Sequence, residues 1–312
     1  MTLLVLLTAM ACIAAPLLTY SLSLAALGLP HVLVELRYVQ RRFGQRVMRR
    51  TAVAMAALLL GVVGLRVARN LGWTVPTSWE LLLVVALVAV VLPALGWRWR
   101  GFGVVLVVTG LLGALVSPLH SLLLLAVLHN LTPVGFLAEV LSGQRRRNAM
   151  ALGTLLFVGI PLLIATGLPF DLLSLWSWTA PDLSFLPTGP LSSQLGAYLP
   201  PEWQDRPWAT HAFSGVVFAQ CMHYAAVLHV LPRLQHGVHT PRFGFGVVLL
   251  TAGLFLLFVG NFADGRRWYG VLAAVHAWVE LPILLLAFGT LRPGAVPRGL
   301  EAAVAGLPRT LP

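Results

Sequence analysis

Two histidine–glutamate pairs, each with a spacing of four residues, are the first feature of this sequence that could do chemistry. They are His31 with Glu35 and His276 with Glu280. Residues at positions i and i+4 lie about 40° apart around a helix, so each pair is expected to share one helix face. Both side chains of a pair can bind one metal ion, or the carboxylate can accept a hydrogen bond from a ligand histidine. Two such pairs indicate a metal site.

Two more histidines, His129 and His223, lie in other apolar segments and complete a candidate set of four imidazoles. His229 lies six residues after His223, about 120° further around a helix, so one ion is not expected to bind both. We therefore favour His223 and keep His229 as an additional candidate. The other additional candidates are polar residues near these histidines: Asn130, Glu139 and Tyr224.

The same residues also fit structural roles. His129 and His223 could form hydrogen bonds between helices without a metal. Glu139 precedes the arginines at 145–147 by less than two helical turns and could pair with them. Only the spatial arrangement of these side chains distinguishes the two interpretations.

Histidine ligands with few carboxylates and no cysteine cluster are typical of iron, zinc or copper bound by nitrogen and oxygen. Cys12 and Cys221 are far apart in the sequence and belong to no thiolate motif. The chain also lacks a phosphate-binding glycine loop, a dinucleotide-binding fingerprint and a Ser-His-Asp signature. We expect Fe(II), with zinc, copper and haem as alternatives. The expected metal ligands are His31, His129, His223 and His276, and Glu35 and Glu280 are expected to orient their imidazoles or complete the coordination.

The elements that must position these residues are membrane-spanning helices. Of the 312 residues, 58% are hydrophobic and only 10% are charged, whereas soluble domains carry about 25% charged residues. A helix needs about 20 apolar residues to cross a bilayer. We predict an all-α, polytopic transmembrane bundle of about nine spans, with eight or ten as alternatives. The predicted spans are 4–29, 51–70, 80–96, 101–117, 118–141, 149–170, 208–232, 243–262 and 268–291.

The net charge of +11 comes from 21 basic residues, all of them arginine. Most of these arginines fall between alternate spans, so the positive-inside rule places the N-terminus outside and the C-terminus in the cytoplasm. Nucleic acid is therefore not an expected partner, since the positive charge is explained by topology. The predicted domains are a transmembrane domain at 1–292, with an external loop at 171–207, and an irregular cytoplasmic tail at 293–312.

In this topology the spans that carry the candidate ligands all run from outside to inside. His31 and Glu35 are predicted toward the cytoplasmic half of the membrane, and His129, His223 and His276 nearer its middle. A single polar cluster between the midplane and the inner leaflet is therefore geometrically possible. No basic segment precedes the first apolar run, so we interpret it as a retained span rather than a cleaved signal peptide.

The segment from Gly28 to Glu35, Gly-Leu-Pro-His-Val-Leu-Val-Glu, resembles the Gly-x-x-His-Gly-x-x-Asp signature of the bacterial membrane-bound beta-carotene dioxygenases, the Brp/Blh family. Val32 and Glu35 replace the glycine and the aspartate of that signature. The resemblance implies an iron enzyme that cleaves beta-carotene centrally to retinal with four histidine ligands, in a bacterial inner membrane. His31 would be the first ligand, with His129, His223 and either His229 or His276 as the others.

The sequence thus favours a metal-dependent membrane oxygenase that acts on a lipid-soluble substrate such as a carotenoid, a terpenoid or another lipid. Its expected partners are that substrate and the membrane lipids. One alternative is a haem protein with axial histidine pairs. A second is a proton-coupled transporter that uses an intramembrane His/Glu relay, and a third is a structural membrane subunit. The sequence leaves the oligomeric state open.

Overall fold

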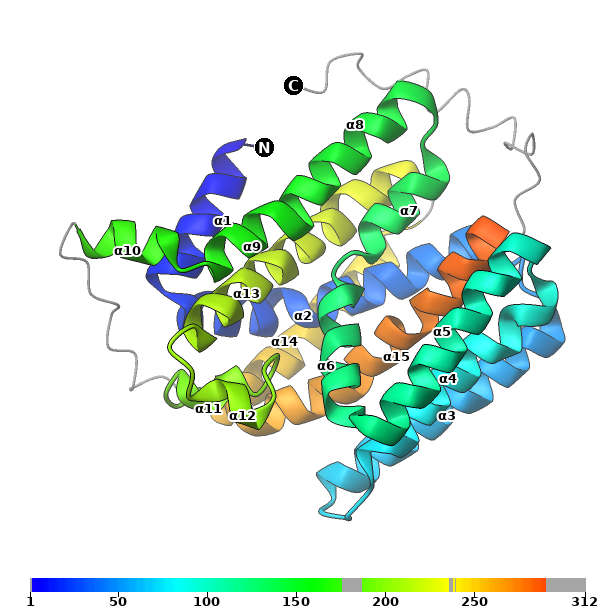
Figure 1. Ribbon diagram of the computed structural model, residues 1–312, viewed down its shortest axis with the longest axis horizontal. Coiled ribbons are helices and arrows are strands. Elements are labelled where there is room, and N and C mark those ends of the chain that lie inside the picture. The colour runs from blue at the N-terminus through cyan, green and yellow to red at the C-terminus, as the bar shows by residue number, and fades with distance from the viewer. Residues whose placement is uncertain (1, 176–186, 236–237, 239, 290–312) are drawn as a thin grey trace.

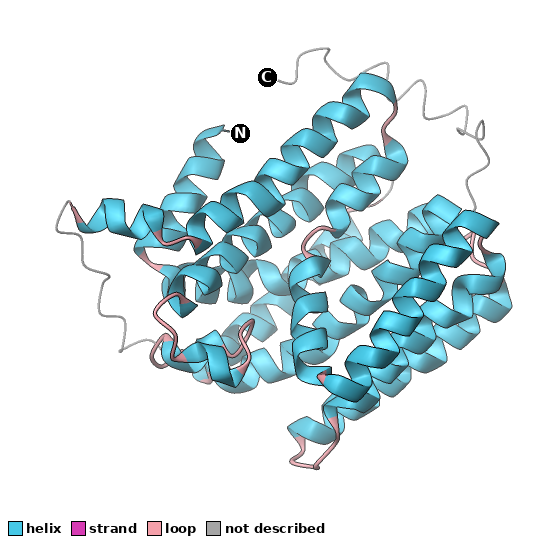
Figure 2. Cartoon of the chain, in the orientation of Figure 1, coloured by secondary structure: helices cyan, strands magenta, loops and turns pink. Residues whose placement is uncertain are grey.

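The protein is an all-helical bundle. The computed structural model describes residues 2–175, 187–235, 238 and 240–289, and every regular element in these ranges is a helix, as Figure 2 shows. The α-helices, labelled in Figure 1, are α1 (Thr2–Ala14), α2 (Pro16–Phe43), α3 (Arg49–Asn70), α4 (Thr77–Val91), α5 (Trp97–Val116), α6 (Pro118–His129), α7 (Thr132–Val140), α8 (Gly143–Thr154), α9 (Ile160–Ala165), α10 (Leu168–Ser174), α11 (Ser192–Leu195), α12 (Pro201–Gln204), α13 (Ala209–Ala225), α14 (Pro241–Gly260) and α15 (Phe262–Gly289).

The predicted transmembrane bundle is confirmed. Within the described residues, eight helices are long and apolar enough to cross a membrane, or nine if α6 and α7 form one bent span. Short π-helical and 3₁₀ segments extend several of these spans: Leu92–Ala94 after α4, Leu155–Gly159 between α8 and α9, and Ala226–Val230 with Leu231–Leu234 after α13.

The predicted first span, 4–29, is wrong. α1 ends at Ala14, and α2 begins at Pro16 and continues to Phe43. Pro16 has no backbone N–H and restricts the residue before it, so it ends one helix and begins the next. Because the spanning helix is α2, His31 and Glu35 lie in its central part rather than toward one end.

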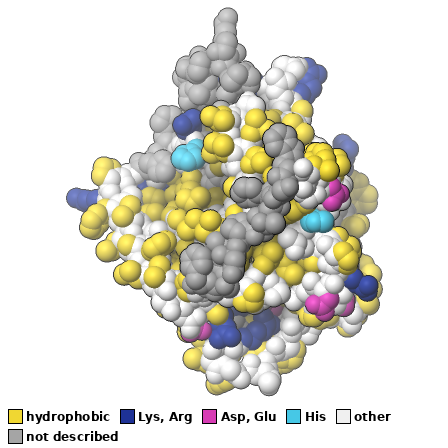
Figure 3. Space-filling view, turned by 90° about the vertical axis from the view of Figure 1, so that its left-hand side faces the viewer, with side chains coloured by type: hydrophobic (Ala, Val, Ile, Leu, Met, Phe, Trp, Pro, Cys, Tyr) yellow, Lys and Arg dark blue, Asp and Glu magenta, His cyan; other side chains and the backbone are white. Residues whose placement is uncertain are grey.

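The interior of the bundle is formed by α2, α13 and α15. More than half of the most apolar segment of each is buried (56%, 61% and 56%), against 6% for α14 and 11% for α5. In Figure 1, α2 and α15 run through the centre of the molecule, and α3, α4 and α5 lie on the far side of α15 from α13 and α9. The face in Figure 3 carries many hydrophobic side chains, and its charged side chains lie mostly toward the margins, as expected for a bundle with a surface that faces lipid.

Two glycines allow inner helices to pack closely. A Cβ atom at Gly215 of α13 would overlap the carbonyl oxygen of Pro161 in α9. A Cβ atom at Gly28 of α2 would lie 3.1 Å from the ring of Tyr269 in α15. Small residues at such contacts are typical of helix packing in membranes. Since Gly28 faces Tyr269 and His31 faces His276, α2 and α15 run in the same direction.

α6 and α7 are bent by 45° relative to each other. The break follows His129, and Pro133 lies in the first turn of α7, where it has no N–H to continue the helix. Non-helical backbone inside a membrane is tolerated where protein buries it or where it lines a cavity. The break lies beside a cavity that His129 and Asn130 line.

The predicted loop at 171–207 and the tail at 293–312 are described only in part. α10 overlaps the start of the loop, and α11 and α12 lie within it. The residues at 176–186 and the whole predicted tail lie outside the described residues.

Candidate metal centre

Four histidines and two glutamates from four helices meet inside the bundle. α2 supplies His31 and Glu35, α6 supplies His129, α13 supplies His223, and α15 supplies His276 and Glu280. His129 has an 11% exposed side chain, and the other five residues are buried, with both glutamates at 0%. The predicted convergence of both His-x-x-x-Glu pairs with His129 and His223 is thus present in the structure.

The donor atoms lie at separations suited to ligands of a common ion. The Nε2 atom of His276 is 3.2 Å from Nε2 of His31 and 3.0 Å from Nε2 of His129. Two ligand atoms that are each about 2.0–2.1 Å from a metal lie roughly 2.8–3.4 Å apart in octahedral or tetrahedral geometry. The arrangement therefore fits neighbouring positions around one ion.

Glu35 joins this arrangement through its carboxylate. Its Oε2 atom is 3.2 Å from Nε2 of His223 and 3.9 Å from Nε2 of His276. His31, Glu35, His223 and His276 each offer a ligand atom within 4.8 Å of the others, and so do Glu35, His129 and Glu280. These groups could hold a metal ion, and Glu35 belongs to both.

One histidine has its tautomer set by the backbone. The Nδ1 atom of His31 lies 3.2 Å from the carbonyl oxygen of Leu27, one turn earlier in α2. Nδ1 therefore carries the proton and donates it to that carbonyl, which leaves the lone pair of Nε2 directed toward His276. Metal-binding histidines are commonly oriented by such a second hydrogen bond.

Several polar atoms of the cluster are buried without a hydrogen-bond partner among the described residues. They are Oε1 of Glu35, both carboxylate oxygens of Glu280, and Nδ1 of His129, His223 and His276. The Nδ1 atom of His129 is 3.1 Å from Oε2 of Glu280 but lacks hydrogen-bond geometry. Burial without a partner is costly for polar atoms, and a cation held by the Nε2 atoms would satisfy carboxylate oxygens among them.

The charges of the cluster also suit a divalent cation. Glu35 and Glu280 contribute two carboxylates, and no arginine forms an ion pair with either one in the part of the chain that the structure describes. Two buried negative charges with neutral imidazoles are strongly unfavourable inside a membrane bundle. A divalent ion neutralises both, so the residues present fit iron, zinc or copper.

The additional candidates have different positions. Tyr224 stacks on His31 with ring centroids 4.1 Å apart. Asn130 is buried at the end of α6 and donates to the carbonyl of Val127. His229 is exposed and belongs to neither metal-binding group.

Glu139 lies outside the cluster and pairs with Arg42 of α2 and with Arg46, which follows that helix. Its carboxylate is 3.0 Å from both Arg42 and Arg46. The sequence suggested the arginines at 145–147 as partners, but the ion pairs of Glu139 are with Arg42 and Arg46 instead.

A cavity of about 660 Å³ connects the cluster to one end of the bundle. All four histidines of the cluster line it, together with Asn130 and Tyr224. This volume lies within the roughly 300–1,000 Å³ typical of small-molecule sites. The histidines are therefore accessible to a ligand although their side chains are buried in protein.

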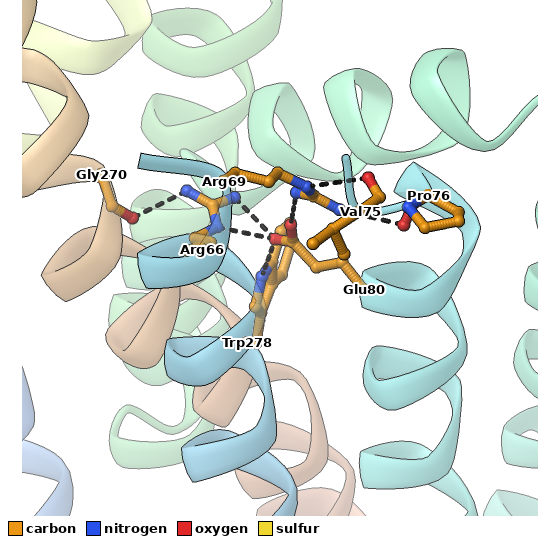
Figure 4. Close-up of polar contacts among 7 residues, drawn as sticks. All are labelled: Arg66, Arg69, Val75, Pro76, Glu80, Gly270 and Trp278. Carbon is orange, nitrogen blue, oxygen red and sulfur yellow. Dashed lines mark hydrogen bonds and ion pairs between the residues drawn. The ribbon is translucent and has the colours of Figure 1, made fainter. Parts of the chain in front are cut away.

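The sequence analysis did not single out Glu80 or the arginines near it. Glu80 is 1% exposed in α4 and pairs with Arg66 at 2.7 Å and Arg69 at 2.6 Å. Trp278 of α15 donates its indole N–H to the same carboxylate, and Figure 4 shows the arrangement. The signal in the sequence is an acidic residue at the start of an apolar run, after two arginines spaced i, i+3 at the end of the previous run.

Comparison with known proteins identifies no relative: no protein-family model matches the chain, and neither a curated protein nor a solved structure matches it.

Proposed function

We propose that the protein is a membrane-embedded, non-haem metal oxygenase with iron as its metal. The observation that carries the proposal is the convergence of four imidazoles, which line a cavity, with two buried carboxylates, all from four apolar helices. Iron with nitrogen and oxygen ligands and open positions supplies oxygen-activating chemistry when bound. The substrate is a lipid-soluble molecule such as a carotenoid, a terpenoid or another lipid.

The residues of the chain have distinct roles in this proposal. His31, His129, His223 and His276 hold the ion, with His31 oriented by the Leu27 carbonyl. Glu35 completes the coordination, because its Oε2 atom lies near two of these imidazoles. Glu280 orients His129 electrostatically, since its Oε2 atom lies 3.1 Å from Nδ1 of that imidazole.

The resemblance of the segment from Gly28 to Glu35 to the beta-carotene dioxygenase signature supports a polyene as the first substrate class to test. His31 and Glu35 of that segment are both members of the cluster. Of the two residues that the resemblance leaves open as the last ligand, the geometry favours His276, since His229 is exposed. A bacterial inner membrane remains the proposed location.

A haem alternative is disfavoured by the spacing of the histidines. Two axial imidazoles hold haem iron from opposite sides, so their nitrogens lie about 4 Å apart, twice a metal–nitrogen bond of about 2 Å. The closest Nε2 pairs here are 3.0 Å and 3.2 Å apart, and this separation leaves no room for a macrocycle between them.

The experiment that tests the proposal is metal analysis of the detergent-purified protein beside His223→Ala, His276→Ala and His229→Ala. We expect iron without a haem spectrum in the wild type and in His229→Ala, and loss of iron from the other two variants. A folded wild type that stays metal-free after reconstitution with Fe(II) would overturn the metalloenzyme proposal and favour a proton-coupled carrier. A screen for oxygen-dependent loss of polyene absorbance, starting with carotenoids, then tests the substrate class.

A further inference from the structure

The cavity that reaches the histidines has a basic end. Arg66 and Arg69 from the end of α3 line it together with Arg266 and Arg267 from the start of α15. On α15, Arg266 precedes His276 by ten residues, which corresponds to about 15 Å along a helix. The guanidinium groups and the imidazoles therefore occupy opposite ends of one cavity.

The carboxylates at this end do not balance the arginines. Glu80 alone pairs with both Arg66 and Arg69. Arg267 pairs with the exposed Asp264 at 3.2 Å. Arg266 donates to the neutral amide oxygen of Gln194 at 2.9 Å and forms no ion pair with a described residue. The described side chains therefore leave excess positive charge at this end of the cavity.

Two of the arginines are held in place by the protein. Arg66 donates to the carbonyl of Gly270 at 2.7 Å, and Arg69 donates to the carbonyls of Val75 and Pro76. Figure 4 shows these contacts around Glu80. Cationic groups that are fixed before a ligand arrives bind an anion with little reorganisation.

Aromatic side chains line the space between the two ends. Tyr20, Tyr198 and Tyr269 line the cavity with Trp278 and the small residue Ala273. The hydroxyl of Tyr198 donates to Gln220, which in turn donates to Ser23 at 3.3 Å. The aromatic rings of the three tyrosines and Trp278 present apolar surface to the cavity, as is typical of sites that bind the hydrocarbon part of a ligand.

We propose that this cavity binds an amphiphile whose anionic group, a carboxylate or a phosphate, lies at the arginine end while its hydrocarbon part extends toward the histidines. Arg266 supplies the charge that determines specificity, because no described carboxylate pairs with it. If the protein is the proposed oxygenase, its substrate is then an anionic amphiphile rather than any lipid-soluble molecule. Only the reaction at the histidine end rests on that proposed function; binding of the amphiphile does not.

The test measures binding of radiolabelled probes to the purified full chain in dodecyl maltoside, with each amphiphile at the same mole fraction of the micelle. The probes are hexadecanoate, hexadecyl phosphate, hexadecanol and inorganic phosphate. We expect the two anionic amphiphiles to bind about tenfold more tightly than hexadecanol. Saturable binding of inorganic phosphate that equals that of the amphiphiles would show a site for a free anion and overturn the proposal.

Arg266→Gln is the decisive variant, since its partner Gln194 is neutral and no buried carboxylate is left unpaired. We expect this variant to lose the preference for the anionic probes and to bind hexadecanol as tightly as the wild type does. Arg100→Gln is the matched control, because Arg100 lies on α5 away from the cavity and donates to the carbonyls of Pro93 and Leu95. An unchanged preference in Arg266→Gln, or an equal loss in both variants, would contradict the proposal.

Iron content measured on the same samples separates this proposal from the proposed function. We expect Arg266→Gln to retain the iron of the wild type. Anion preference in a protein that binds no iron would overturn the metal site alone. Bound iron in a protein that does not distinguish hexadecanoate from hexadecanol would overturn the amphiphile site alone.

Discussion

The carboxylate of Glu35 and the imidazole of His223 meet across the α2–α13 contact, with Oε2 of Glu35 3.2 Å from Nε2 of His223. Both side chains are buried, and 188 residues of sequence separate them. Glu35 is also the member that the two metal-binding groups share. Glu35 therefore joins the two groups of donor atoms into one polar centre.

Replacing each glutamate in turn is expected to distinguish the one that binds the metal from the one that orients a metal-binding histidine. Glu280→Gln should lower iron affinity roughly 10–100-fold, the cost typical of losing a partner that orients a metal-binding histidine. Glu35→Gln should lower the iron affinity further, because Oε2 of Glu35 lies close to two imidazoles. Titration of the metal-free protein with Fe(II) measures both affinities. Glu139→Gln is the control and should retain wild-type affinity, since Glu139 pairs with arginines outside the cluster; a larger loss in Glu280→Gln than in Glu35→Gln would reverse the assigned roles.

Glu80 is expected to stabilise the fold without contributing to metal binding. Glu80→Gln removes the carboxylate that pairs with Arg66 and Arg69 and that accepts from Trp278. Breaking a buried ion pair from one side costs roughly 3–5 kcal/mol of unfolding free energy. Unfolding in mixed micelles with increasing denaturing detergent measures this loss. Unchanged stability together with lost iron would show that Glu80 belongs to the metal site instead.

Bound metal is expected to stabilise the bundle, because the ion binds donors from four helices only when they are assembled. Iron at 100 times its dissociation constant should add about 2.7 kcal/mol. A membrane-compatible chelator should therefore lower the midpoint of thermal unfolding of the wild type but not of His276→Ala. An equal effect of the chelator on both proteins would indicate a metal bound elsewhere.

Gly215 is expected to be essential for the close packing of α13 against α9. Gly215→Ala places a methyl group against the Pro161 carbonyl oxygen, in the backbone of a neighbouring helix. Such overpacking typically costs about 1–3 kcal/mol. Gly253→Ala in α14 is the matched control, because a Cβ atom there meets no other atom within 4 Å. The free energies of unfolding of the two variants in the same detergent should differ by this amount, with the lower thermal midpoint in Gly215→Ala. Equal midpoints would contradict the predicted overlap.

The arginine distribution predicts which end of the cavity faces outward. Arg206 and Arg147 are both exposed, and the positive-inside rule places them on opposite sides of the membrane. With Cys12 and Cys221 replaced by alanine, a membrane-impermeant maleimide should label Arg206→Cys in intact cells. It should label Arg147→Cys only after permeabilisation. The reverse pattern would invert the topology and place the arginine end of the cavity in the cytoplasm.

The sequence by itself determined most of the helical spans, though not the bounds of the first, and the identity of the cluster. Apolar segments of about 20 residues that must satisfy every backbone hydrogen bond internally become helices in a membrane. Ionisable residues in those segments are costly, so they marked His31, Glu35, His129, His223, His276 and Glu280 before their positions were known. The i, i+4 spacing placed two of the histidines on the same helix faces as their glutamates because it depends only on helix geometry.

Tertiary structure decided everything that depends on how the helices pack against one another. It placed His276 in the cluster and His229 outside it, and it paired Glu139 with Arg42 and Arg46. It also brought Glu80 to Arg66 and Arg69. His31 and His276 are 245 residues apart, and their contact depends on the rotation and depth of two helices. No local pattern encodes these quantities, since many side chains that are far apart in the sequence set them together.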